Sequence, residues 1–259
     1  MSNDMRSVLV TGASGGIGRA VCIRLARSGR ALVLAARDEG KLSALCDELQ
    51  SVHPGHYEAI PVDMGDGAAV AAFGARLVEQ GTLLDGVVLM PPQMPATNDC
   101  LPSSDTWRTT MSINLDTNLV LLRECHALLR LSMRGGRVVI VGSKNVAAPG
   151  PGAAAYSASK AALHQLARVA ALEWGEDRIR VNTLHPNAVF DTGIWTPEVL
   201  AARAASYNMS VEEYKTNNVL KVEVSSQDVA RLAAELCGPL FAKTTGAQIP
   251  VDGGNIRVI

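Results

Sequence analysis

The chain has 259 residues, a net charge of −1 and a hydrophobic fraction of 47%, which is enough for a large core but leaves no basic stripe or charge block. This composition argues against nucleic-acid and anionic-membrane binding, and no run approaches the ~20 apolar residues of a membrane span. Five cysteines without a C-x-x-C pair, five histidines without ligand spacing and a polar start without a signal peptide predict a cytoplasmic protein that holds no metal.

Apolar runs of strand length alternate with helical patterns along the whole chain. Continuous apolar runs indicate strands that are buried on both faces, as in a parallel sheet. Strands are predicted at 7–11, 31–36, 59–62, 86–90, 137–142, 180–184 and 248–251, and helices at 16–28, 39–51, 68–80, 105–133, 153–175 and 227–237. Repeated strand–helix units with short connections predict an α/β fold with a doubly wound parallel sheet and helices on both faces.

No linker rich in Pro, Gly or Ser divides the chain, so residues 1–259 are interpreted as one domain. The long departure from the strand–helix rhythm is 187–226, where about two lesser helices replace a short connection. An insertion after a late strand lies at the carboxyl end of the sheet, where ligands bind in such folds. We therefore predict a substrate lid at 187–226.

A glycine-rich turn follows the first predicted strand, in Thr11-Gly-Ala-Ser-Gly-Gly-Ile-Gly18. Its glycines allow a tight turn and a close approach of the backbone to a pyrophosphate, and the helix that follows offers its N-terminal N–H groups. The turn lacks the Gly-Lys-Ser/Thr of a Walker loop. We expect it to bind a dinucleotide through Gly12, Ser14, Gly16, Ile17 and Gly18.

The end of the second predicted strand reads Ala35-Ala36-Arg37-Asp38. An NAD site commonly has a carboxylate at this strand tip, whereas an arginine can hold the 2′-phosphate of NADP with its forked donors. Arg37 favours NADP(H), and Asp38, one residue later, keeps NAD(H) as an alternative. Asp63, which closes the third strand, is placed either to contact the adenine or to cap the next helix.

Tyr156 and Lys160 are four residues apart, so a helix places them on one face, one turn apart. A neighbouring cation favours the phenolate and lowers the pKa of a tyrosine from its usual ~10. Such a tyrosine can give or take a proton at a carbonyl or alcohol oxygen, provided that a cofactor carries the hydride. Ser143 lies just upstream. By itself, however, Tyr-x-x-x-Lys also occurs by chance on many helix surfaces.

With the glycine turn and Ser143 preceding Tyr156-x-x-x-Lys160, the chain resembles the short-chain dehydrogenase/reductase superfamily over essentially its whole length. The resemblance implies a Rossmann-type sheet of about seven parallel strands, a nicotinamide cofactor and a homotetramer, or a homodimer. It assigns four catalytic positions, to Asn114, Ser143, Tyr156 and Lys160.

The resemblance also implies their roles. Ser143 would hold the substrate oxygen, and Tyr156 would exchange a proton with it. Lys160 would lower the pKa of Tyr156 and bind the nicotinamide ribose. Asn114 would kink its helix and hold a water that links Lys160 to solvent.

Two loops depart from the family pattern. Leu89-Met-Pro-Pro-Gln93 replaces the usual Asn-Asn-Ala-Gly, and its prolines remove backbone donors and fix φ near the cofactor. Pro186-Asn187 replaces Pro-Gly. We expect Met90, Pro91, Pro186 and Val189 to line the cofactor. His185 either reaches the nicotinamide side or packs in the interior.

A narrower similarity is carried by Ser143-Lys-Asn145, by Pro186-Asn-Ala-Val-Phe190 with Trp195, and by Lys243-Thr-Thr-Gly-Ala247. These stretches resemble the dehydrogenase domain that is fused to bacterial sugar-phosphate aldolases. That resemblance implies a sugar-derived hydroxyl or carbonyl group as the substrate.

The sequence thus predicts an NADP(H)-dependent oxidoreductase that interconverts a ketone and a secondary alcohol, with a carrier-bound 3-oxoacyl thioester as one candidate substrate. A sugar or polyol dehydrogenase using NAD(P) and a cofactor-binding protein with little turnover are the alternatives. The lid predicts an apolar to mixed pocket through Phe190, Ile194, Trp195, Tyr207, Met209 and Tyr214. Its basic residues Arg203, Lys215 and Lys221 are scattered and are interpreted as solvated.

Overall fold

The computed structural model describes residues 6–91 and 100–256. They contain one sheet in the order β3-β2-β1-β4-β5-β6-β7, with every neighbouring pair parallel. The predicted fold class is therefore confirmed. The strands are β1 (Ser7–Thr11), β2 (Ala31–Ala36), β3 (Tyr57–Pro61), β4 (Leu84–Leu89), β5 (Arg137–Val141), β6 (Arg180–Pro186) and β7 (Gln248–Val251).

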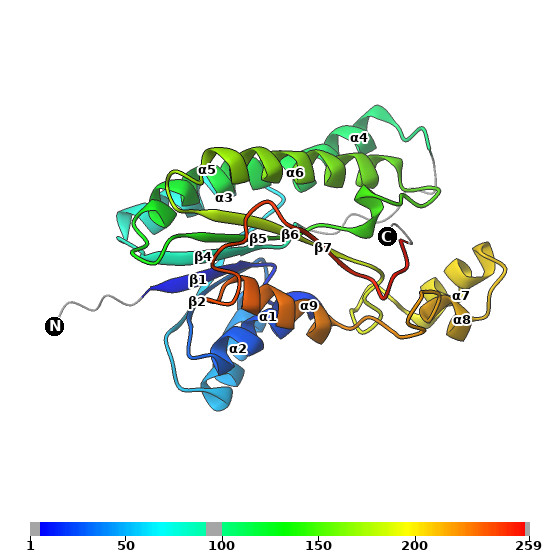
Figure 1. Ribbon diagram of the computed structural model, residues 1–259, viewed down its shortest axis with the longest axis horizontal. Helices are drawn as coiled ribbons and strands as arrows, with labels where there is room; N and C mark the ends of the chain where they lie inside the picture. Colours follow the sequence, from blue (N-terminus) through cyan, green and yellow to red (C-terminus); the bar gives the residue numbers. More distant parts are fainter. Residues whose placement is uncertain (1–5, 92–99, 257–259) are drawn as a thin grey trace.

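Helices cover both faces of the sheet (Figure 1). One layer holds α3 (Gly67–Glu79), α4 (Ser104–Met111), α5 (Thr117–Arg130) and α6 (Ala154–Glu173), and the other holds α1 (Gly16–Arg27), α2 (Glu39–Val52) and α9 (Ser226–Leu236). Successive residues of the central strand β1 enter different cores, since Val8 and Val10 pack in one cluster and Leu9 in the other. This two-sided burial explains the continuous apolar strands.

The chain reverses its direction of travel across the sheet between β1 and β4, which are neighbours although two strands separate them in sequence. At such a point the connections leave on opposite faces and open a crevice at the carboxyl ends of the strands. Beyond this edge lie the two helices α7 (Pro197–Ser206) and α8 (Val211–Lys215), which belong to the segment 187–226 (Figure 1).

The two ends of the segment 187–226 are joined to each other. Val189 and Val224 form an isolated parallel bridge. The Asp191 carboxylate accepts hydrogen bonds from the backbone N–H of Ser226 at 2.9 Å and from its hydroxyl at 2.7 Å. These contacts tie the base of the segment to the start of α9, so the part that carries α7 and α8 is a closed excursion.

The long helix predicted at 105–133 is wrong in one respect, because α4 and α5 are separated by a π-helical segment, Ser112–Asp116. There the Asn118 amide donates to the carbonyls of Ile113 at 3.2 Å and Asn114 at 3.0 Å, and the Thr117 hydroxyl donates to Ile113 at 2.8 Å. Side chains that bond to backbone carbonyls compete with the regular helical pattern. This bulge sets the position of Asn114.

One alternative for Asp63 is also wrong, because the residue that caps α3 is Asp66. The Asp66 carboxylate accepts from the backbone N–H groups of Ala68 and Ala69 at 2.8 and 3.2 Å. Asp63 instead accepts from the N–H of Gly65 at 2.9 Å and is exposed just after β3.

A buried charged group stabilises the opposite, amino-terminal edge of the sheet. The Asp85 carboxylate lies 3.4 Å from the Arg137 guanidinium and 3.8 Å from that of Arg30, and it accepts a 2.7 Å hydrogen bond from the Ser132 hydroxyl. Both Asp85 and Arg137 are buried. Removing one member of such a group leaves the other charge desolvated and unpaired.

We expect Asp85→Ala to lower the free energy of unfolding by about 3 kcal/mol or more, because Arg137 would remain buried without its carboxylate. Urea denaturation followed by circular dichroism measures this loss. Asp105→Ala is the matched control, since Asp105 is exposed where it pairs with Arg108, and it should cost less than about 1 kcal/mol. Equal losses in the two variants would contradict the assignment.

Candidate active site

The glycine-rich turn leaves the N-terminus of α1 open. Gly12 has a φ of +60°, and a Cβ on Gly18 would lie 2.0 Å from the Gly12 carbonyl oxygen, so neither position accommodates a side chain. Gly15 begins the helix without a side-chain hydrogen bond to its first turn. Ser14 and Ile17 are half-buried beside it. Exposed N–H groups at a helix N-terminus fit the pyrophosphate of a dinucleotide.

The end of β4 packs directly on this turn. The Met90 N–H donates to the Thr11 hydroxyl at 2.8 Å, and the Cβ of Met90 lies 3.6 Å from where a Cβ on Gly12 would be. Pro91 is buried. The rest of the unusual loop, Pro92 and Gln93, lies outside the described residues. Pro186 and Val189, at and after the end of β6, are buried at the same edge of the sheet.

Arg37 and Asp38 follow β2, and their side chains differ in the partners that they contact. Asp38 caps α2 by accepting from the Lys41 N–H at 2.9 Å, and this hydrogen bond holds the pKa of its carboxyl below the usual value. It also lies 3.5 Å from the Lys41 ammonium. Arg37 is exposed and has no ion-pair partner in the part of the chain that the structure describes. The guanidinium is therefore the group that is available to a ligand.

Ser143, Tyr156 and Lys160 come together where β5 ends and α6 begins. The Ser143 hydroxyl is close enough to the Tyr156 phenol to lower its pKa, and Lys160 Nζ lies 5.5 Å from the centre of the Tyr156 ring. The Ser143 hydroxyl also accepts from the N–H of Asn145 at 3.2 Å. Strand β5 thus delivers the hydroxyl, and the first two turns of α6 deliver the phenol and the ammonium.

The electrostatics of this group differ from the prediction. Burial raises the pKa of Tyr156 above its usual value, although the hydrogen bond from Ser143 acts in the opposite direction. Burial also lowers the pKa of Lys160 to about 7. A lysine that is partly neutral near pH 7 is a weak cation, so the expectation that Lys160 lowers the pKa of Tyr156 is wrong for the protein alone.

Asn114 connects the π-helical segment to the same group. It is fully buried, and its amide donates to the Ser159 hydroxyl at 3.0 Å, which in turn donates to the Tyr156 carbonyl at 2.8 Å. Its own Oδ1 is buried without a hydrogen-bond partner among the described residues. An acceptor left in this state costs free energy unless a water or a ligand satisfies it.

His185 supports Ser143 from behind. One ring nitrogen lies 2.9 Å from the Ser143 carbonyl oxygen and the other lies 2.8 Å from the Gln248 side-chain oxygen. The ring is buried. Of the two predicted alternatives, the structure therefore supports the interior one, in which His185 links the ends of β5, β6 and β7.

A cavity of about 220 Å³ lies at the segment 187–226, and Lys144, which follows Ser143, is part of its lining. The predicted pocket residues Phe190, Tyr207 and Tyr214 line it, whereas Ile194, Trp195 and Met209 do not. Sequence reasoning missed its other lining residues, which are Lys144, Asn187, Ala188, Asn217 and Asn255. Lys144 directly follows Ser143, and its ammonium donates to the Asn255 side-chain oxygen at 2.9 Å. No spacing in the sequence connects residues this far apart, although Lys144 and Phe190 lie in stretches that the narrower resemblance singled out.

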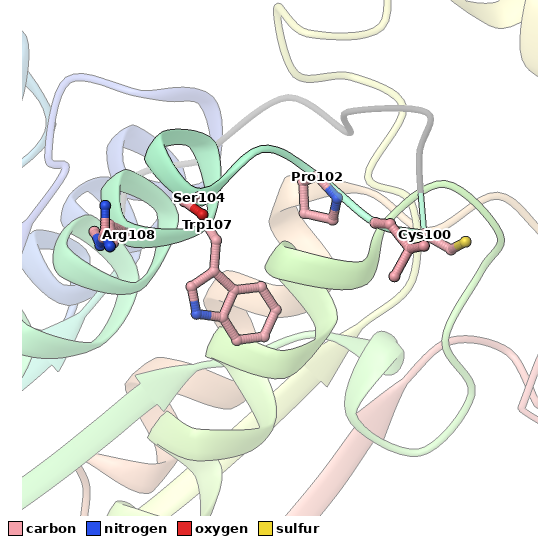
Figure 2. Close-up of a pocket in the computed structure, with 6 residues that line it drawn as sticks. Cys100, Pro102, Ser104, Trp107 and Arg108 are labelled. Carbon is pink, nitrogen blue, oxygen red and sulfur yellow. The ribbon is translucent and has the colours of Figure 1, made fainter.

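A larger hollow of about 300 Å³ lies beside α4 and is lined by Cys100, Leu101, Pro102, Ser104, Trp107 and Arg108 (Figure 2). None of its lining residues belongs to the Ser143 group or adjoins a member of it in sequence, whereas Lys144, which follows Ser143, lines the smaller cavity. Its charged residue Arg108 lies 3.6 Å from the Asp105 carboxylate. We therefore place the candidate active site at Ser143 and not here.

Within 6–91 and 100–256, no three His, Cys, Asp or Glu side chains gather in a way that could hold a metal ion. The helices in these ranges are also too short or too polar to cross a membrane.

Residues 6–201 match the family model described as short chain dehydrogenase. The chain belongs to this family. Membership makes it an NAD(P)-dependent oxidoreductase that acts on alcohol and carbonyl groups, which confirms the resemblance drawn from the motifs.

Two curated relatives and one solved structure illustrate the range of this family. The uncharacterized oxidoreductase YuxG of Bacillus subtilis is 32% identical over 95% of this chain, which spans only 37% of that relative's length. The rhamnolipids biosynthesis 3-oxoacyl-acyl-carrier-protein reductase of Pseudomonas aeruginosa is 30% identical, and the match covers 96% of this chain and 95% of that relative. The RhlG/NADP active-site complex of Pseudomonas aeruginosa is 29% identical with a TM-score of 0.82, and the match covers 97% of this chain and 96% of that one.

We expect Lys160→Met to stabilise the protein at pH 6.5 relative to the wild type, by a margin that shrinks by a few kcal/mol when the pH is raised to 9.5. The folded-state pKa of about 7 lies below the ordinary value, so the unfolded chain binds more protons across this range. The cost of burying the ammonium is complete below pH 7 and is relieved as the pH rises. Urea denaturation at both pH values measures the margin.

Lys243→Met provides the control, because Lys243 is exposed and its replacement should give a difference that does not change with pH. A margin for Lys160→Met that is constant between the two pH values would show that Lys160 titrates normally.

Proposed function

We propose that this protein is an NADP(H)-dependent oxidoreductase that interconverts a ketone and a secondary alcohol. The observation that carries the proposal is the grouping of Ser143, Tyr156 and Lys160, with the lysine ammonium 5.5 Å from the phenol ring, at the sheet edge that also bears the glycine turn. The bound nicotinamide supplies or accepts the hydride. The protein supplies the position of the substrate and the proton.

In this proposal the residues act at one substrate oxygen. The Ser143 hydroxyl donates a hydrogen bond to it, and Tyr156 gives it a proton as the carbonyl is reduced or takes the proton in the reverse direction. Because burial raises the pKa of Tyr156, the phenol is a proton donor in the protein alone. Asn114 is a positioning residue, whose unpartnered Oδ1 would accept from the water that the family places between it and Lys160.

The cofactor would be held along the carboxyl edge of the sheet. Its pyrophosphate fits the residues Gly12, Ser14, Gly16, Ile17 and Gly18, and its adenosine half fits Arg37 and Asp63. The nicotinamide half fits Met90, Pro91, Pro186 and Val189, with Lys160 at the ribose. The exposed Arg37 and the engaged Asp38 support NADP(H) over NAD(H), as does the NADP complex of the similar Pseudomonas protein.

The segment 187–226 is proposed as the substrate lid of a single domain that functions in the cytoplasm as a homotetramer or homodimer. The name of the similar Pseudomonas reductase supports a 3-oxoacyl thioester as one substrate candidate. A sugar or polyol remains the other candidate.

Arg37→Ala should weaken NADPH binding by about ten-fold or more, because the 2′-phosphate loses a charge-assisted, forked contact, while NADH binding changes little. Titration calorimetry with both cofactors measures the two dissociation constants. Lys41→Ala removes a nearby exposed cation and should affect both cofactors weakly. An equal effect of Arg37→Ala on the dissociation constants of NADPH and NADH would contradict the NADP(H) assignment.

Tyr156→Phe should lower kcat at least a hundred-fold across a panel of ketones with NADPH, because the variant has no proton to donate. The matched control is Tyr57→Phe. Tyr57 lies on the edge strand β3, far from the site, and the variant removes a hydroxyl that donates to the His53 carbonyl. It should retain activity. Equal background rates in wild type and Tyr156→Phe would favour the alternative of a cofactor-binding protein with little turnover.

A further inference from the structure

The cavity beside Ser143 has an unusual lining for a reductase of apolar ketones. Three of its residues are asparagines, namely Asn187, Asn217 and Asn255, and Lys144 is its charged side chain. Among the described residues that line it, none is a carboxylate. The cavity therefore offers both hydrogen-bond donors and acceptors, together with a positive charge that no lining group neutralises.

Lys144 is held in place and does not extend freely into solvent. Its ammonium donates to Asn255, whose own amide donates to the Asn217 carbonyl. Burial lowers the pKa of Lys144, while the nearby Asp252 carboxylate acts in the opposite direction. The Asp252 carboxylate accepts hydrogen bonds from the backbone N–H groups of Gly254 and Ile256, at 2.9 Å each. The amide and the ammonium thus form a fixed polar wall one residue from Ser143.

Three other residues that line the cavity are aromatic. The rings of Tyr207 and Tyr214 stack with their centres 5.7 Å apart, and Phe190 meets Tyr214 edge-on at 5.9 Å. The Tyr207 hydroxyl oxygen lies 3.5 Å from where a Cβ on Gly150 would be, in the loop that leads into α6 and Tyr156. The lid therefore rests on the approach to the catalytic group, and the cavity lies between the two.

We propose that this cavity binds a compact polyhydroxylated substrate, of the sugar-alcohol or sugar-acid class, whose oxygens contact Lys144 and the asparagines while its C–H face packs on the tyrosines. This inference rests on the proposed oxidoreductase function and specifies its substrate. It selects the polyol alternative over the acyl thioester.

Two physical arguments favour this class. A volume of about 220 Å³ is below the ~300–1,000 Å³ of pockets for drug-sized ligands, which favours a compact substrate over a long acyl chain. An apolar chain would also cover the ammonium, which has one hydrogen-bond partner among the described residues for its three donors, and would displace water from it without replacing those hydrogen bonds. Hydroxyl groups satisfy both the donors and the acceptors of the wall.

The oxidation step balances without another reactant. The hydride of one secondary C–H bond would pass to the oxidised nicotinamide, the hydroxyl proton would pass to Tyr156 after the phenol has released its own proton to solvent, and the carbon would become a ketone. Reduction reverses the same transfers. Lys144 takes no part in them and acts as a specificity-determining residue at a second oxygen of the substrate.

The test compares wild type with Lys144→Met in the NADP⁺-dependent oxidation of sorbitol, gluconate, cyclohexanol and a 3-hydroxybutyryl thioester. We expect wild type to prefer sorbitol or gluconate to the thioester in kcat/KM. Lys144→Met should lower kcat/KM for the preferred compound by roughly 10–100-fold, mainly through KM, as loss of a hydrogen bond to a charged group does. Oxidation of cyclohexanol should change less than about three-fold.

Lys221→Met is the matched control, since Lys221 is an exposed lid lysine that does not line the cavity, and it should leave all four rates unchanged. A stronger effect on gluconate than on sorbitol would identify the acid as the source of the oxygens, and the reverse would identify the neutral polyol. A preference for the thioester, or an equal loss for cyclohexanol and the polyols in Lys144→Met, would overturn the proposal.

Failure of the proposed function is recognised separately by calorimetric binding of sorbitol and gluconate to the protein with NADP⁺. Binding that depends on Lys144 without turnover that depends on Tyr156 would support the substrate class and reject the oxidoreductase role. Turnover of cyclohexanol that depends on Tyr156, without binding of either polyhydroxylated compound, would support the oxidoreductase role and reject the substrate class.

Discussion

Parallel pairing of the strands is the constraint on which the rest of this structure depends. Because all seven strands run in one direction, their carboxyl ends meet at a single edge. Thr11, Met90, Ser143 and Pro186 are far apart in sequence but end neighbouring strands there. The hydrogen bond from Met90 to Thr11 joins the two strands at the switch point. The glycine turn, the catalytic hydroxyl and the base of the lid are brought together by this geometry.

Burial governs the chemistry of the group at that edge. Tyr156 and Lys160 lie in the first turns of a helix packed on the sheet, so desolvation opposes the charged form of both side chains. The protein alone therefore has a protonated phenol beside a lysine of weakened charge. Asn114 adds a buried acceptor without a partner in the described residues. A site with unsatisfied groups of this kind is arranged for molecules that enter it.

The segment 187–226, which we propose as the lid, would add selectivity to this arrangement. Its bridge between Val189 and Val224 and the bonds of Asp191 to Ser226 fix its base, while its aromatic cluster faces Lys144. Six of the eight residues that line the cavity belong to the segment 187–226, and Lys144 and Asn255 do not. Substitutions within this segment can therefore change the shape of the cavity while leaving the glycine turn, Ser143 and Tyr156 in place.

The sequence by itself determined the fold and the members of the Ser143 group. Period, glycine placement and the spacing of Tyr156 from Lys160 are local properties, because a strand, a turn or a helix is encoded by residues that are close in the chain. Local pattern failed where side chains compete with the backbone. Periodicity gave one helix across Asn114, where only the family resemblance implied a kink and where Asn118 bonds to a backbone carbonyl. The cap of α3 is Asp66 and not Asp63.

Only the tertiary structure decided the directions in which the pKa values of Tyr156 and Lys160 shift. It alone also decided the hydrogen bond between Lys144 and Asn255. Desolvation depends on every element packed around a group, and no spacing along the chain contains that information.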